Sequence, residues 1–420
     1  MRLVERKYLL PFVVVTSLFA LWGFANDITN PMVAAFQTLM EFSTAKASLI
    51  QFAFYGGYAT MAIPAALFIR RYSYKKGILL GLALYAIGAF LFIPAAARQS
   101  FELFCISLYV LTFGLAFLET TASPFILSLG AKENATRRLN LAQAFNPMGS
   151  LAGMMVASMV VLPNLLSDKR DASGNILFPM LTEAEKAEIR LHDLAVIRDP
   201  YVALGMVVLV ILVVIALVKV PQARNEGKRG VLKRLWKNKA YREGVVAQVF
   251  YVAAQIMVWT FIIHYADNLG INKATAQNYN IAAMCLFLVG RFFSTWLMKY
   301  ADGRRLLTIF GIGAALCSLG AVLIVGKVGL YCLVGISFFM SLMFPTIYGT
   351  ALEHVLIEDT SLGAAFLVMA IVGGALMPPL QGMIIDCGTI FGHPAVNVSY
   401  CLPLLCFVVV TVYGIRSRKL

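Results

Sequence analysis

Apolar and polar positions alternate along the chain in long blocks, with predominantly apolar stretches separated by short polar segments. Most blocks are about 20 residues long or longer, the length that an α-helix needs to cross a hydrocarbon layer ~30 Å thick. The pattern therefore predicts twelve membrane-spanning helices. They cover residues 8–37, 45–70, 75–97, 101–129, 135–163, 198–220, 244–267, 274–299, 305–326, 328–353, 362–386 and 394–415.

The composition supports an all-α membrane protein. Hydrophobic residues make up 60% of the chain and charged residues only 13%, whereas soluble proteins carry roughly 25% charged residues. The first apolar block is too long for a signal peptide and continues through Asn26 and Asp27 to Pro31, so we expect it to be a retained span. The 7 cysteines show no metal-binding or disulfide spacing, and we expect no metal and no cofactor.

Two longer polar segments divide the series of spans. Residues 164–199 are mixed in charge, and residues 221–243 are basic and separate six spans from six. We predict an N-terminal six-helix bundle over residues 1–220, a cytoplasmic linker over 221–243 and a C-terminal six-helix bundle over 244–420. Two such halves are a recurrent transporter plan, in which the substrate binds near the middle of the membrane.

The net charge of +14 would suit a nucleic-acid-binding protein, but its distribution argues against one. Most of the 35 Lys and Arg residues lie in loops on the same side as the two termini. Positively charged loops mark the cytoplasmic side of a membrane protein, so both termini are predicted to be cytoplasmic. No basic segment is interleaved with aromatic residues for base stacking, and we expect no nucleic-acid partner.

Three charged residues lie well inside predicted spans: Asp27, Glu119 and Arg291. Such residues are costly in a membrane and usually face a cavity or a partner. Glu119, in the stretch "FLETTASPF", is the sharpest case. Burial disfavours an ionised carboxylate, so a carboxyl that faces water and apolar surroundings in turn can bind a proton and release it on the other side. We favour this role over a permanent bond from Glu119 to Arg291 or to the backbone.

Asp27 lies in "WGFANDITNP", where Trp22, Asn26 and Asn30 form a stripe at helical spacing. An aromatic ring, two amides and a carboxylate suit a sugar, because sugar ring faces stack on aromatics and hydroxyls need donors and acceptors. The alternative is a polar contact between helices. We favour binding, with Asp27 beside the stripe.

More amides and aromatics occur on other predicted spans. These are Gln143 and Asn146 on span five, Gln255 and Trp259 on span seven, and Tyr348 on span ten. Each alone is as consistent with packing as with binding, but together they indicate a neutral, hydroxylated solute. Arg291 lies near the cytoplasmic end of span eight, and we assign it a gating or structural role. Gly149 and Gly153 have the spacing of close helix packing.

Five stretches of the chain resemble the fucose permease group of sugar:proton symporters in the major facilitator superfamily. They are "FLETTASPF", "RLNLAQAFNPMG", "YVAAQIMVW", "VGRFFSTWLM" and "FPTIYG". The resemblance implies two pseudo-symmetric six-helix bundles, alternating access and import of a monosaccharide driven by protons. It also implies that Glu119 exchanges the proton with sugar and that Gln143 and Asn146 line the cavity.

Two positions depart from the family pattern. The resemblance places a coupling aspartate where this chain has Asn30, and an asparagine where it has Asp27. The two positions are three residues apart on neighbouring parts of one helix face. We therefore predict that Asp27 takes over the coupling role.

The sequence thus predicts a monomeric, proton-coupled importer of L-fucose or a related hexose in the inner membrane, with sugar and proton as co-substrates and the lipid bilayer as its surroundings. It is not expected to be an enzyme, because no nucleophile–base pair or metal cluster is evident. Two alternatives stay open. One is an exporter of hydrophobic compounds, which the 18 Met residues would suit. The other is a non-transporting membrane sugar sensor, which should carry a soluble signalling module.

Overall fold

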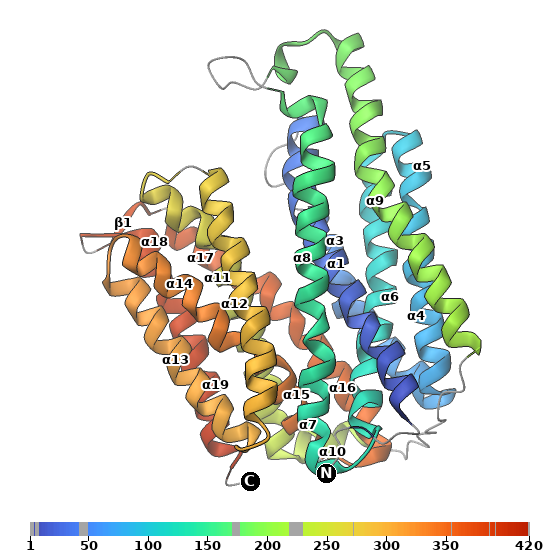
Figure 1. The fold of residues 1–420 in the computed structure, drawn as a ribbon, viewed down its shortest axis with the longest axis vertical. Helices are drawn as coiled ribbons and strands as arrows, with labels where there is room; N and C mark the ends of the chain where they lie inside the picture. Colours follow the sequence, from blue (N-terminus) through green and yellow to red (C-terminus); the bar gives the residue numbers. More distant parts are fainter. Residues whose placement is uncertain are drawn as a thin grey trace. The chain divides into compact units, whose positions relative to one another are not determined.

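The structure is a computed structural model that describes residues 4, 8–41, 49–169, 177–217, 230–271, 273–353, 355–385, 387–390 and 392–418. These residues are almost entirely helical (Figure 1). Contacts divide the chain into two compact units. The first unit comprises residues 13–122 and 148–224, and the second comprises residues 1–12, 123–147 and 225–420.

The first unit contains the helices that carry Trp22, Asp27 and Glu119. Its elements are α1 (Leu9–Leu39) from residue 13, α3 (Leu49–Arg71), α4 (Tyr74–Phe90), α5 (Phe92–Ala97), α6 (Phe101–Ser128) as far as residue 122, α8 (Phe145–Val156) from residue 148, the π-helical turn η3 (Ala157–Val161), the 3-10 turns η4 (Leu162–Asn164), η5 (Leu166–Asp168) and η6 (Phe178–Met180), and α9 (Glu183–Leu217). Helix α4 packs along α9, and α5 continues that contact.

The second unit contains the remaining helices and one short hairpin. Its elements are η2 (Lys132–Asn134), α7 (Ala135–Gln143), α10 (Val231–Lys237), α11 (Lys239–Asn268), α12 (Lys273–Leu297), α13 (Gly303–Leu323), α14 (Lys327–Met340), α15 (Met343–Glu353), η7 (Ile357–Asp359), α16 (Thr360–Met369), η8 (Ala370–Val372), α17 (Gly373–Ile385), β1 (Thr389–Ile390), β2 (His393–Pro394), α18 (Ala395–Ser399) and α19 (Cys401–Arg416). Strands β1 and β2 are antiparallel, with Thr389 opposite Pro394. Helix α13 packs against α14 and α19, and α11 contacts α15, α17 and α19.

Within the described residues, 11 helical segments are long and apolar enough to cross a membrane. They are Leu9–Thr29, Tyr74–Ala97, Phe101–Ser128, Ala135–Val161, Glu183–Leu217, Lys239–Ile262, Asn278–Leu297, Gly303–Leu323, Lys327–Glu353, Thr360–Ile385 and Ala395–Arg416. Each coincides with one predicted span. The remaining predicted span, residues 45–70, coincides with α3, which is 23 residues long. The all-α membrane fold is therefore confirmed.

The sixth predicted span begins at residue 198, whereas the helix that contains it, α9, begins at Glu183 and takes in the second half of the polar segment 164–199. The physical reason is a capping box: the backbone N–H of Thr182 donates to Glu185 Oε2 at 2.9 Å, and the backbone N–H of Glu185 donates to Thr182 Oγ1 at 3.4 Å. Polarity alone does not distinguish a capped helix outside the membrane from a loop.

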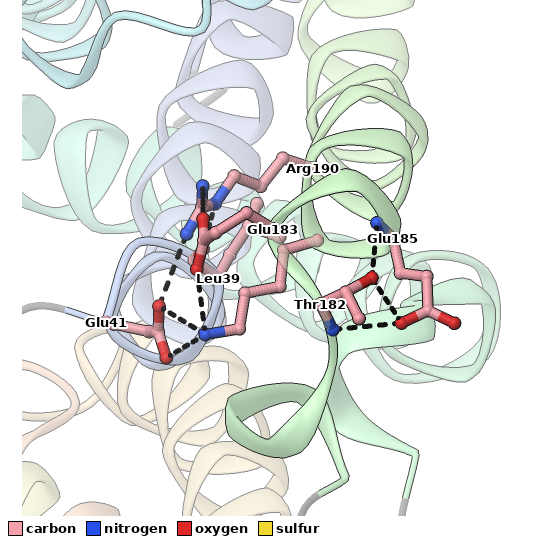
Figure 2. Close-up of polar contacts among 7 residues, drawn as sticks. Leu39, Glu41, Thr182, Glu183, Glu185 and Arg190 are labelled. Carbon is pink, nitrogen blue, oxygen red and sulfur yellow. Dashed lines mark hydrogen bonds and ion pairs between the residues drawn. The ribbon is translucent and has the colours of Figure 1, made fainter.

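The polar start of α9 is held against the end of α1 by charged contacts. Glu41 accepts hydrogen bonds from Lys186 Nζ at 3.0 Å and from Arg190 Nη2 at 3.3 Å, and Arg190 Nε donates to the Leu39 carbonyl at 3.2 Å (Figure 2). Glu183 lies within ion-pair distance of both cations. The polar extension of α9 therefore fixes the end of the helix that carries Asp27.

Helices α1 and α8 approach each other through glycines. A Cβ added at Gly153 would lie 2.7 Å from the Phe24 carbonyl oxygen, and one added at Gly149 would overlap the Ala20 carbonyl. Both neighbours are backbone atoms, which cannot rotate away. The predicted close packing at Gly149 and Gly153 is therefore confirmed, and the two backbones are in direct contact.

This contact makes a testable stability prediction. Gly149→Ala should lower the free energy of unfolding by about 1–3 kcal/mol, the usual cost of overpacking a filled core. The matched control is Gly335→Ala on α14, where the nearest atom to an added Cβ is Cys317 Sγ at 3.8 Å. The melting temperature of the detergent-solubilised protein, followed by size-exclusion chromatography after heating, should fall in the first variant and not in the second. Equal melting temperatures would contradict the packing argument.

Candidate functional site

Helix α1 presents two unpaired polar atoms on one face. Trp22 is 3% exposed, and its ring meets Phe19 edge-on at a centroid distance of 4.5 Å. Trp22 Nε1 and Asn26 Oδ1 are both enclosed and have no hydrogen-bond partner among the described residues. A buried polar atom without a partner costs about 1–3 kcal/mol. A polar ligand that pairs with this donor and this acceptor, one helical turn apart, would recover that cost.

Asp27 follows directly and is 9% exposed. It lies within electrostatic range of Tyr55 on α3. Asn30 belongs to α1 as predicted, but its side chain lies outside the described residues.

Glu119 lies in the middle of α6 and is half-buried. It is within electrostatic range of the Tyr58 hydroxyl. In the described residues of its own unit it makes no ion pair and no hydrogen bond. The carboxyl is therefore not locked to a cation of that unit, as a purely structural acid would be.

Sequence reasoning missed the two tyrosines beside these acids. Tyr55 and Tyr58 are three residues apart on α3, and Tyr58 also lies within electrostatic range of Tyr55. Gly57 lets α3 approach α6 this closely, because a Cβ there would lie 2.8 Å from Thr112 Cβ. The signal was present in "FYGGY", where two glycines separate two tyrosines with helical spacing.

The second unit places Gln143 against Arg291. Arg291 Nη1 on α12 donates to Gln143 Oε1, at the end of α7, at 3.4 Å. Arg291 is only 4% exposed, and its guanidinium lies over the Phe287 ring, 4.9 Å from the centroid. Tyr251 on α11 lies within electrostatic range of the Arg291 guanidinium. Arg291 therefore sits in a packed aromatic environment rather than extending to the membrane surface.

Helix α7 makes further polar contacts with the same unit. Arg137 Nε donates to the Thr295 carbonyl on α12 at 3.3 Å, and Asn140 Nδ2 donates to Thr346 Oγ1 on α15 at 3.3 Å. Arg137, Asn140 and Gln143 are spaced at three-residue intervals, so one face of α7 carries all these contacts. This face is a polar docking surface.

The other predicted residues of the second unit differ in what they can offer a ligand. Asn146 and Gln255 are half-buried. Trp259 Nε1 donates to Ser337 Oγ at 3.1 Å, so Trp259 can offer its ring face but not its N–H. The Trp259 ring packs edge-on against the Phe287 ring, with a centroid distance of 5.1 Å. Tyr348 has no exposed surface, and its ring stacks on the Phe344 ring with an angle of 18° between the two ring planes.

Phe287 therefore connects two predicted site residues, since it contacts both the Trp259 ring and the Arg291 guanidinium. Gln143, Arg291 and Trp259 are brought together around it within one unit. Sequence reasoning missed Phe287, because a single phenylalanine in an apolar helix carries no distinguishing pattern.

Sequence reasoning also missed a completely buried arginine. Arg138 donates from Nε to the Ile126 carbonyl at 3.1 Å, from Nη2 to Leu127 at 2.6 Å and from Nη1 to Ala131 at 3.1 Å. Carbonyls at the end of a helix lack intrahelical partners, and a cationic donor satisfies them. Arg138 therefore caps the end of α6, the helix that carries Glu119.

Among the described residues no group of three or more His, Cys, Asp or Glu side chains is arranged to hold a metal ion. The predicted site residues supply amides, aromatic rings, two carboxyls and one guanidinium.

The model of the Major Facilitator Superfamily matches residues 15–378 of the chain. The chain belongs to the major facilitator superfamily. Its relatives in this superfamily include the L-fucose-proton symporter of Haemophilus influenzae, 61% identical over 424 residues that cover 100% of this chain and 99% of the relative. The L-fucose-proton symporter of Escherichia coli is 34% identical and is matched over 98% of this chain and 93% of the relative.

Solved structures of the superfamily agree with this assignment. FucP in the outward conformation has a TM-score of 0.88 and 32% sequence identity, covering 98% of this chain and 99% of that structure. The proton:xylose symporter XylE has a TM-score of 0.73 at 13% identity, which shows a common fold alone. The protein is thus a multi-pass membrane protein of this superfamily.

The cap formed by Arg138 can be tested against its neighbour in sequence. Arg138→Met should remove the three hydrogen bonds to the Ile126, Leu127 and Ala131 carbonyls and sharply reduce the yield of monodisperse protein, because a hydrogen bond from a charged group contributes about 1.5–3 kcal/mol. Arg137→Met removes the hydrogen bond to the Thr295 carbonyl and should have a much smaller effect. Fluorescence-detected size-exclusion chromatography of tagged variants measures the yield. Similar losses in the two variants would argue against the cap.

Proposed function

We propose that the protein is an L-fucose:proton symporter of the inner membrane that imports its sugar by alternating access. The observation that carries this proposal is the 61% identity, over the whole chain, to the L-fucose-proton symporter of Haemophilus influenzae. The 34% identity to the Escherichia coli L-fucose-proton symporter supports it. Neither relative favours the exporter or the sensor.

The chemistry of the units is consistent with a neutral sugar. Trp22 Nε1 and Asn26 Oδ1 offer a donor and an acceptor that have no hydrogen-bond partner among the described residues, and Trp259 offers a ring face. We assign sugar contacts to these residues and to Asn30, Gln143, Asn146, Gln255 and Tyr348. Arg291 is the only buried cation among the predicted site residues, which fits a neutral rather than an anionic substrate.

We assign proton coupling to Glu119 and Asp27. Glu119 binds a proton from outside, which removes the cost of an ionised carboxylate among apolar helices. The protonated carrier then binds sugar, reorients and releases both to the cytoplasm. An inward movement of one positive charge is driven by about 2.3 kcal/mol per 100 mV of membrane potential.

The arrangement in the membrane follows from the same proposal. Residues 1–220 and 244–420 form two bundles joined by the cytoplasmic linker 221–243. Both termini are cytoplasmic, because most Lys and Arg lie in loops on their side. The protein acts as a monomer surrounded by lipid and as a carrier rather than an enzyme.

Proton coupling by Glu119 can be separated from sugar exchange. Glu119→Gln should abolish alkalinisation of the medium on L-fucose addition but leave sugar counterflow in proteoliposomes, since the neutral amide mimics the protonated acid. The matched control is Glu102→Gln at the exposed start of the same helix, which should retain both activities. Persistent alkalinisation in Glu119→Gln would remove this residue from the coupling mechanism.

The position of the second acid can be tested by exchange within α1. Asp27→Asn should abolish sugar-driven proton uptake, and Asp27→Asn combined with Asn30→Asp should restore part of it, because the carboxyl returns to the same helix face. Proton uptake is followed with a pH electrode in cells that express each variant at equal levels. Full coupling in Asp27→Asn alone would refute the assignment.

The substrate is identified by counterflow in proteoliposomes. The wild-type protein should exchange labelled L-fucose faster than D-galactose, D-glucose, D-mannose or N-acetyl-D-glucosamine. Exchange of another sugar in preference to L-fucose would leave proton-coupled sugar import intact and would change the proposed substrate.

A further inference from the structure

The hydrogen bond between Arg291 and Gln143 fixes which end of the Gln143 amide faces Arg291. A glutamine amide has an acceptor end, Oε1, and a donor end, Nε2, while a guanidinium has only donors. Arg291 Nη1 lies 3.4 Å from Gln143 Oε1, and because the guanidinium can only donate, the atom that faces it must be the amide oxygen. The two N–H groups of Gln143 then point away from Arg291.

Arg291 is itself held firmly enough to impose this orientation. Its side chain is 4% exposed and its guanidinium rests on the Phe287 ring at 4.9 Å. Thr295 Oγ1 donates to the Arg291 carbonyl at 2.7 Å, which ties the backbone of that turn of α12. No carboxylate forms an ion pair with Arg291 in the described part of the chain, so no acid competes with Gln143 for its donors.

We propose that Arg291 is a positioning residue that holds the Gln143 amide with its oxygen toward Arg291. Gln143 then contacts the sugar as a hydrogen-bond donor, through its Nε2 group. The inference rests on the proposed sugar contact of Gln143. It assigns that contact a polarity: the sugar atom facing Gln143 is an accepting oxygen, either a hydroxyl or the ring oxygen. Without Arg291 the amide can turn over and present its acceptor instead.

A double-mutant cycle tests whether Arg291 acts through Gln143. Dissociation constants are measured by isothermal titration calorimetry for the monosaccharide that the wild-type protein exchanges. Gln143→Ala should weaken binding about tenfold and Arg291→Met about fivefold, the range expected for one hydrogen bond and for its partial loss. The double variant should bind no more weakly than Gln143→Ala, because Arg291 has no effect once the amide is gone. Multiplied losses would overturn the proposal, since Arg291 would then act independently.

A second variant keeps Arg291 in place and removes only the donor. Gln143→Glu supplies a carboxylate, which accepts from Arg291 but has no N–H to donate. Its melting temperature should equal or exceed that of the wild-type protein, because it forms an ion pair, yet its sugar affinity should fall at least as far as that of Gln143→Ala. Wild-type affinity in Gln143→Glu would overturn the proposal even if Arg291→Met fails to fold.

The outcomes also separate this inference from the proposed function. Unchanged sugar affinity in Gln143→Ala would remove Gln143 from the sugar site and overturn the inference, while symport itself would stand. A wild-type protein that exchanges no monosaccharide would overturn both.

Discussion

The cost of placing polar groups in a hydrocarbon layer governs this protein. A helix satisfies its own backbone hydrogen bonds, so an apolar span is stable in a membrane without further polar contacts. Each polar side chain inside a span then needs a partner or a function. Arg138 has carbonyl partners, Trp259 has a serine, and Gln143 has an arginine. Trp22 and Asn26 have enclosed polar atoms without a protein partner in the described part of the chain, and for that reason they are good ligand-binding candidates.

The fold was largely predictable because membrane spans leave a strong sequence signal. Blocks of apolar residues located each of the 11 candidate spans. The early start of α9 was missed because the residues 183–197 are polar, and their helix depends on the Thr182–Glu185 capping box and on contacts with Glu41. A threonine followed three residues later by a glutamate is nevertheless a sequence signature of a helix N-terminus, and it is present here at Thr182 and Glu185.

The candidate site was predictable by residue type but not by partner. Charge and amide placement singled out Glu119, Gln143 and Arg291, yet spacing along one helix says nothing about a neighbour on another helix. The contact between Gln143 and Arg291 joins residues 148 positions apart. Tyr55, Tyr58 and Phe287 were missed for the same reason, because aromatic residues are common in apolar spans and only tertiary contacts distinguish them.

The glycine contact between α1 and α8 has a consequence for motion during the transport cycle. The two backbones touch at Gly149 and Gly153 without intervening side chains. The contact therefore contains no side chain that could change rotamer to let one helix slide past the other. Helices packed in this way must move together as one rigid body. Trp22 and Asn26 lie on α1, so any movement of α8 would also displace their polar atoms and change their contacts with a bound molecule.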